Sequence, residues 1–203
     1  MTARGLAGLA VLLLAGCLPS ARPTAIREYS LEYAPPPVSG RPLSVSVRVA
    51  PFSVRSVYDR QLMVYREDEY VTGTYVDARW SANPGAMLGD LLARDLATSG
   101  LYRAILHGPA SIPGDYQLGG EIEAIDERTT ADGCAAQLEV RVLLVRARGT
   151  SREAVVLQQS FGTAQPCRCG DARRMAAAMS AAAATVSGQV QAAVYTAIAR
   201  DQP

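Results

Sequence analysis

The stretch RWSANPGAMLGDLLARDLATSG, residues 79–100, holds the only tryptophan of this 203-residue chain and carries the signals of both ends of a helix. Asn83 can cap the first turn, Pro84 suits the first helical position, and Gly100 stands just past the last turn. We expect Arg94 to face away from the core. The apolar face consists of Met87, Leu88, Leu91, Leu92 and Leu96. The stretch therefore predicts an amphipathic helix that packs one face on a core.

Alternation of apolar and polar residues predicts strands on both sides of this helix. The clearest case is LSVSVRVAPF at 43–52, where apolar residues on one face alternate with serine and arginine. A second helix, rich in alanine, is predicted from a cap at Asp171 to about Ala199. The other predicted strands cover 26–33, 62–64, 70–76, 101–107, 116–128, 133–149 and 153–162.

This order of elements, in which each helix follows a group of strands, is typical of α+β proteins. We predict one domain over residues 26–203 with two layers, a mixed or antiparallel sheet and the two main helices packed on one face of it. The larger apolar residues of the second helix recur at close to helical spacing, and they are Met175, Met179, Val186, Val190, Val194 and Ile198. This period indicates a packed helix rather than a low-complexity tail.

The charge balance argues against a nucleic-acid-binding protein. The chain has 20 basic residues, all of them arginine, and 19 acidic residues, for a formal net charge of +1. Arg4 belongs to the predicted leader, so the mature chain has 19 basic and 19 acidic residues and a net charge of zero. A near-neutral chain without a basic stripe lacks the electrostatic footprint of a nucleic-acid-binding protein.

The N-terminus predicts a lipoprotein. An apolar run over 6–15 is too short for a membrane-spanning helix, which needs about 20 residues, but it suits a signal peptide over residues 1–16. The run ends in Leu-Ala-Gly-Cys and resembles the bacterial lipobox, in which the cysteine, here Cys17, is acylated and becomes the first residue. The alternative is an ordinary leader with an incidental cysteine. Residues 17–25 would be the lipidated tether, since several acyl chains anchor a protein stably in a membrane.

By resemblance to the sorting rule of Gram-negative lipoproteins, the residue after the lipidated cysteine predicts the membrane. That residue is Leu18 rather than aspartate. The resemblance therefore implies the periplasmic face of the outer membrane.

Three cysteines remain after lipidation of Cys17, and this compartment is oxidising. We expect one disulfide from Cys134 to either Cys167 or Cys169, with the third thiol left free. It would close a loop of about 35 residues and stabilise the fold by about 3–4 kcal/mol. A metal site at the Cys-x-Cys pair is the weaker alternative, because the chain has a single histidine. We expect neither a metal nor a cofactor.

No residue pattern indicates an enzyme. His107 is the sole histidine, and no Gly-x-Ser-x-Gly motif accompanies it. Glu121 and Glu123 are expected on one face of a strand, as are Asp126 and Glu127 near its end, and paired carboxylates can hydrolyse glycosides. A solvated sheet face explains them more simply. We therefore predict a protein without catalytic activity, with an envelope hydrolase using Glu121 and Glu123 as the alternative.

The order of these pieces resembles a known family. A lipobox is followed by YSLEY, LSVSVRVAPF, LMVYREDEY, the tryptophan stretch, YQLGGEIEAID and a terminal helix. This order is similar to that of the ABC-type transport auxiliary lipoproteins, the PqiC-like family, over about residues 28–199. The most specific positions are Tyr65, Arg66, Trp80, Pro84, Met87, Leu88, Ser99 and Gly100. The three cysteines at 134, 167 and 169 do not belong to the family pattern.

The resemblance implies a non-enzymatic partner of an ABC transporter built around an MCE-domain protein, together with its permease and ATPase. Such systems move phospholipids or other hydrophobic molecules between membranes. A structural lipoprotein of the outer envelope without a transporter is the alternative. Trp80 either packs over the first turn of its helix or belongs to a partner-binding face. Aromatic residues and arginine are the usual hot spots of such faces, and the candidates are Tyr65, Arg66, Tyr70, Tyr75 and Trp80.

Overall fold

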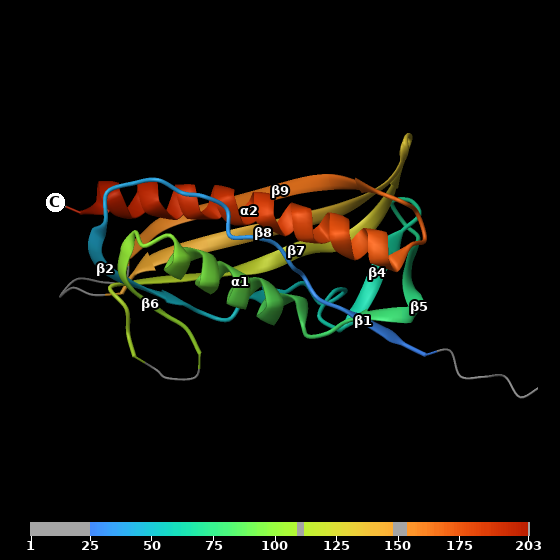
Figure 1. The fold of residues 1–203 in the computed structure, drawn as a ribbon, viewed down its shortest axis with the longest axis horizontal. Helices are drawn as coiled ribbons and strands as arrows, with labels where there is room; N and C mark the ends of the chain where they lie inside the picture. Colours follow the sequence, from blue (N-terminus) through green and yellow to red (C-terminus); the bar gives the residue numbers. More distant parts are fainter. Residues whose placement is uncertain (1–24, 109–111, 148–153, 203) are drawn as a thin grey trace, which may run out of the picture.

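The computed structural model describes residues 25–108, 112–147 and 154–202 of the chain (Figure 1). The signal peptide, Cys17 and all but the last residue of the tether lie outside the described residues. The elements are β1 (Arg27–Tyr29), β2 (Leu43–Val49), β3 (Ser53–Val54), β4 (Leu62–Arg66), β5 (Thr72–Trp80), α1 (Pro84–Thr98), β6 (Tyr102–Leu106), β7 (Tyr116–Thr130), β8 (Gly133–Arg146), β9 (Ala154–Cys167) and α2 (Ala172–Asp201).

The described strands form one mixed sheet around three long antiparallel strands, β7, β8 and β9. The other edge of β7 pairs in parallel with β2 near its start, with β3 in its middle and with β4 near its end. The sheet continues from β2 to β6 at one end, and from β4 through β5 to β1 at the other. Of the two predicted sheet types, the mixed sheet is therefore correct.

Both helices pack on the same face of this sheet and contact each other, as the α+β prediction required (Figure 1). α2 lies over β8 and β9, and α1 lies over the β2, β3 and β6 side. Alternate residues of β8 point into the layer between sheet and helices, because successive side chains of a strand face opposite sides. Leu138, Val140, Val142 and Leu144 have no exposed surface, and the six predicted apolar residues of α2 are likewise buried.

The helix ends follow their predicted capping signals. The side chain of Asn83 accepts a hydrogen bond from the Gly85 N–H at 2.9 Å, and Pro84 is the first residue of α1. Asp171 caps α2 by accepting from the Arg174 N–H at 3.1 Å. Gly100 has a φ of 66°, a left-handed conformation that glycine adopts without steric cost.

Two expectations are wrong in the region that joins the helices. The predicted strand 26–33 is a strand only over Arg27–Tyr29, after which the chain leaves the sheet edge and runs along the helix layer (Figure 1). Arg94 does not simply face away, because its guanidinium lies 4.8 Å from the centre of the Tyr33 ring. Tyr33 donates to the buried Asp95 of α1 at 2.8 Å, and Ser187 of α2 donates to the same carboxylate at 2.5 Å. This crossing segment and a buried carboxylate thus tie the two helices together.

Candidate functional site

The predicted partner-binding residues lie at the end of the sheet where β4 and β5 meet β7, but they do not form one surface. Trp80 has no exposed surface, and a side chain without exposed surface cannot contact a partner of the folded domain. It is therefore removed from the candidate set. Tyr65 and Tyr75 form an edge-to-face pair with ring centres 5.8 Å apart. Tyr70 lies in the turn between β4 and β5. Its side chain is 85% exposed, so a partner can contact it.

Arg66 belongs to a network around a fully buried carboxylate. Asp126 of β7 accepts hydrogen bonds from the Tyr58 hydroxyl and from Arg66 Nε at 2.9 Å on one oxygen. Its other oxygen accepts from Arg128 Nε at 2.9 Å. Burial and the hydrogen bond to Asp126 raise the pKa of Tyr58, so the hydroxyl stays protonated and donates. Two arginines and one tyrosine therefore compensate the charge of Asp126 and fix the loop that carries Tyr58.

A hollow of about 440 Å³ opens beside this network. It lies on the sheet face opposite the helices, because its lining residue Glu139 alternates in β8 with the core residues Leu138 and Val140. Its lining carries both signs of charge, from Arg55, Arg66, Asp68, Glu69, Glu123, Arg128 and Glu139. The lining suits a polar surface of a partner and not the chain of a lipid, which needs apolar walls.

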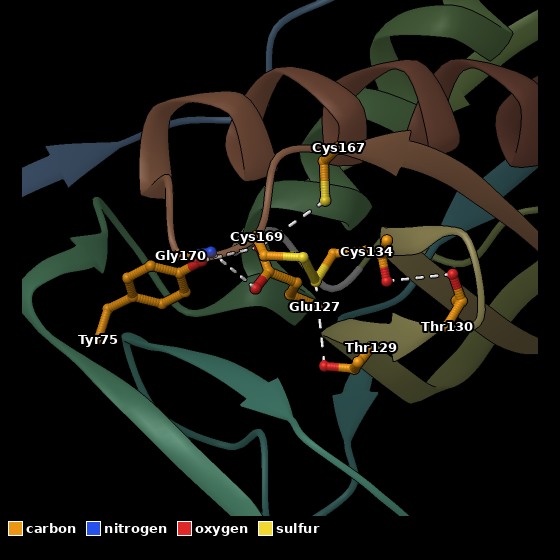
Figure 2. Close-up of a disulfide and its surroundings, with 9 residues drawn as sticks. Tyr75, Glu127, Thr129, Thr130, Cys134, Cys167, Cys169 and Gly170 are labelled. Carbon is orange, nitrogen blue, oxygen red and sulfur yellow. Dashed lines mark hydrogen bonds between the residues drawn. A yellow bond between two sulfur atoms is a disulfide. The ribbon is translucent and has the colours of Figure 1, made fainter.

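Glu127, the next residue of β7, is also buried but faces the helix side (Figure 2). It accepts hydrogen bonds from the Tyr75 hydroxyl at 2.8 Å and from the Gly170 N–H at 3.2 Å, and the Cys167 thiol lies 3.7 Å away. Burial and Glu127 raise the pKa of the Tyr75 hydroxyl, and they raise the pKa of the Cys167 thiol to about 11. Glu127 therefore joins β5, the end of β9 and the turn before α2 through neutral donors.

The structure pairs Cys134 with Cys169, with Cα atoms 5.1 Å apart, and leaves Cys167 as the free thiol (Figure 2). The sequence had left both pairings open. Cys167 stands opposite Cys134 in the strand register. The strand ends at Cys167, and a turn over residues 168–171, closed by the Asp171 N–H donating to the Arg168 carbonyl at 3.3 Å, contains Cys169 within bonding distance of Cys134. The disulfide thus connects the start of β8 to the turn that begins α2.

The carboxylates and the histidine considered for catalysis are all engaged in structural contacts. Glu121 and Glu123 both bind Arg141, at 2.7 and 2.9 Å. The expectation that Asp126 and Glu127 share a face is wrong, because consecutive strand residues point to opposite faces. His107 contacts Asp90 at 2.7 Å and the Val49 carbonyl at 3.2 Å. Among the described residues, no group of three or more His, Cys, Asp or Glu side chains can hold a metal ion.

Sequence reasoning missed two members of the Asp126 network. Tyr58 lies in the connection between β3 and β4, which carries no periodic pattern, and only the folded loop brings it over β7. Arg128 sits two residues after Asp126 in β7, and that spacing places both on one face of the strand. The contact between Arg128 and Asp126 could therefore have been predicted. The contact between Tyr58 and Asp126 could not, because it depends on the path of the loop.

The sequence model of the ABC-type transport auxiliary lipoprotein component matches residues 29–191, most of the chain. This chain belongs to that family. The family resemblance noted from the lipobox, the strands and the tryptophan stretch is thereby confirmed. The chain is accordingly an auxiliary lipoprotein component of ABC-type transport, and its family is not an enzyme family.

Solved structures share the fold at low sequence identity. Protein XCC0632 from Xanthomonas campestris is 22% identical with a TM-score of 0.78, and the match covers 86% of this chain and 98% of that one. An uncharacterized protein is 13% identical with a TM-score of 0.63, covering 84% and 99%. The hypothetical protein CT253 from Chlamydia trachomatis is 14% identical with a TM-score of 0.54, covering 75% and 96%. No curated protein sequence matches this chain significantly.

No helix in the described ranges combines the length and the apolar character needed to cross a membrane.

Proposed function

We propose that this chain is the outer-membrane-anchored, periplasm-facing lipoprotein of an MCE-type ABC transport system that moves lipids or other hydrophobic molecules between membranes. The family assignment supports the association with an ABC transporter. The Leu-Ala-Gly-Cys sequence supports acylation of Cys17, and Leu18 supports sorting to the outer membrane. The lipobox is the observation that carries the proposal, because anchoring explains why an auxiliary protein works beside a transporter that spans another membrane.

We further propose that the β4–β5 end of the domain docks on the MCE-domain protein. Tyr70 projects from the turn there, and Asp68 orders that turn by accepting from the N–H groups of Tyr70 and Val71 at 2.7 and 2.8 Å. An exposed tyrosine held by an ordered turn loses little conformational freedom on binding, which favours a hot spot. The mixed-charge hollow beside Arg66 would receive polar groups of the same partner.

The test is co-purification of the acylated full-length protein with the purified MCE-domain oligomer in detergent. We expect capture by the wild type and a loss of at least tenfold with Tyr70→Ala. Ile112→Ala is the matched control, because Ile112 is another exposed apolar residue, at 59%, in the β6–β7 connection. Absence of capture by the wild type would favour the alternative, a structural envelope lipoprotein without a transporter.

A separate variant tests the anchor itself. Replacing residues 1–17 by an ordinary cleavable leader removes both the lipobox and the thiol that is acylated, so we expect the protein to leave the membrane fraction and appear in the soluble periplasmic fraction. Mass spectrometry of the wild type should show an acylated N-terminal cysteine. An unmodified thiol at residue 17 contradicts the lipoprotein assignment, whatever the outcome of the docking experiment.

We also propose that the protein has no catalytic activity of its own. Glu121 and Glu123 are the carboxylates that most resemble a catalytic pair. Both of them bind the same arginine, Arg141. We expect Glu121→Ala and Glu123→Ala to leave envelope phenotypes unchanged. A phenotype equal to that of gene deletion would instead support the hydrolase alternative.

A further inference from the structure

Besides the two-residue strand β3, three described strands pair on one side only, β1, β6 and β9, and they differ in how they are protected against pairing. β1 has three residues, two of them charged, and β6 has five residues with a charge at its second residue, Arg103. β9 has fourteen residues, AVVLQQSFGTAQPC, with no charged residue among them. Proteins commonly block exposed edges by short length, charge or proline. Two edges use these devices, whereas β9 has a proline only at its penultimate residue.

The free side of β9 is a backbone surface with unpaired hydrogen-bonding groups. β9 pairs with β8 and with no other described strand. Alternate N–H and C=O groups along roughly 45 Å of strand therefore point outward. Several side chains along it are exposed as well, including Gln158, Gln159 and Ser160, and Val155 is 61% exposed. Such an edge is complementary to the backbone of another extended segment.

A groove runs beside the first half of this edge. It has a volume of about 610 Å³ and lies between β9 and the last turns of α2. Leu157 and Gln159 line it from the strand, and Ala192, Ala193 and Ala197 line it from the helix. Because the helix side chains in the middle of the groove are those of three alanines and the short Thr196, the space beside the strand stays open for side chains of an added strand. The groove is uncharged along most of its length, with Arg200 and Asp201 at one end.

We propose that the first half of β9, residues 154–160, accepts an extended segment of a partner protein as an additional strand of the sheet. Backbone hydrogen bonds supply the affinity in this mode, and the alternating pockets supply the selectivity. The partner segment is uncharged and places small or β-branched side chains toward the groove. This interaction surface is separate from the β4–β5 end and does not depend on the proposed transporter.

α2 packs over both β8 and β9, and the groove opens between its last turns and the free edge of β9. A second copy joined through β9 would place its own α2 about two strand spacings from this one, roughly 10 Å, so that its helix would fill the groove. An extended segment without a covering helix leaves the groove to its own side chains, and the experiment below separates these two occupants.

The experiment uses the full-length acylated protein in detergent and a short synthetic peptide that alternates valine and threonine between terminal lysines. We expect saturable binding, and we expect amide hydrogen exchange in residues 154–160 to slow by about tenfold at saturation. The same peptide with every backbone amide N-methylated has no N–H donor on either edge and should not bind. Gln159→Lys places a charge in the groove and should abolish binding. Gln117→Lys, the same change at an exposed glutamine of β7, is the matched control and should not.

Three outcomes overturn the proposal. The first is absence of saturable binding to the wild type, and the second is equal binding of the N-methylated peptide. The third is slow amide hydrogen exchange in residues 154–160 without peptide, if it becomes slower still as the protein concentration rises. That result assigns the β9 edge to a second copy of the chain. Thermal unfolding of Gln159→Lys near the wild-type temperature confirms that loss of binding is not loss of fold.

Discussion

Asp126 and Glu127 are neighbours in β7 and both are buried, but the two sides of the strand satisfy their carboxylates in different ways. On the side away from the helices, Asp126 meets two arginines and a tyrosine. On the helix side, Glu127 meets a tyrosine, a backbone N–H and a thiol, all of them neutral donors. A disulfide, Cys134–Cys169, stabilises the helix side as well, and no disulfide joins the described residues of the other side.

The difference shows that a buried carboxylate needs donors, and that these need not be charged. Removing one partner of a buried ion pair leaves the other charge uncompensated, whereas removing a neutral donor leaves one unsatisfied polar group. The Asp126 side should therefore be the more sensitive to loss of charge. The Glu127 side should depend more on its covalent link.

The largest effect is expected from removing that link. Cys134→Ala abolishes both possible pairings, since Cys167 faces Cys134 in the register and could replace Cys169. The disulfide closes a loop with a sequence separation of 35, so its loss should lower the free energy of unfolding by about 3–4 kcal/mol. Urea unfolding monitored by circular dichroism measures this change. Cys167→Ser keeps the disulfide and should stay within about 0.5 kcal/mol of the wild type.

Asp126→Asn should cost about 3 kcal/mol, the lower end of the range for breaking a buried ion pair. The side chains of Arg66 and Arg128 are 28% and 38% exposed, so water partly solvates the charges that are left. Asp77→Asn is the matched control, because the Arg27–Asp77 pair spans 3.6 Å and its side chains are 69% and 35% exposed. That change should cost less than about 1 kcal/mol. Equal losses in the two variants would mean that burial of the ion pair does not set the cost of breaking it.

Glu127→Gln keeps the size of the side chain and removes its charge. One of its two accepting oxygens becomes an NH2 group that faces a donor, which should cost about 1–3 kcal/mol. The same urea experiment measures the loss. If Glu127→Gln lowered the free energy of unfolding more than Asp126→Asn does, the Glu127 side would be the more sensitive to loss of charge. That result would mean that the neutral donors depend on the charge of Glu127.

For the part of the molecule around Asp126 and Glu127, the sequence predicts the strands and the helix start better than it predicts the contacts between them. Periodicity is a local property, so the strands around Leu62 and Thr72 and the cap at Asp171 are found from the residues themselves. The burial of Asp126 and Glu127 depends on Tyr58 and Gly170, which reach them from 68 and 43 residues away. The path of a loop without periodicity sets such contacts. The same limit applies to Trp80, whose position before a helix is compatible with a surface and with the core.

The choice between Cys167 and Cys169 shows the limit of register arguments. Strand pairing alone places Cys167 opposite Cys134, and a sequence argument from register would select that pair. The structure pairs Cys169 instead, in the turn over residues 168–171 that follows the last residue of β9. Pairing thus depends on the path of the first two residues after the strand, which strand register does not predict.

The smallest effect concerns the proton of Cys167, which reports on the Glu127 side alone. Burial and Glu127 raise the pKa of this thiol from 9.0 to about 11. The folded protein therefore keeps the proton over a pH range in which the unfolded chain releases it. The resulting contribution to stability is complete below pH 9 and is lost as the pH rises toward 11. The difference in unfolding free energy between the wild type and Cys167→Ser should change over this range.

Alkylation by iodoacetamide measures the same group directly, because the thiolate is the reactive form. The rate for the folded protein should reach half of its maximum near pH 11, and Glu127→Gln should shift this midpoint downward, since the variant lacks the negative charge beside the sulfur. Asp126→Asn serves as the control, because Asp126 faces the other side of β7 and should leave the midpoint unchanged. A midpoint near pH 9 in the wild type would mean that neither burial nor Glu127 acts on the thiol, and Glu127 would then be held by the Tyr75 hydroxyl and the Gly170 N–H without it.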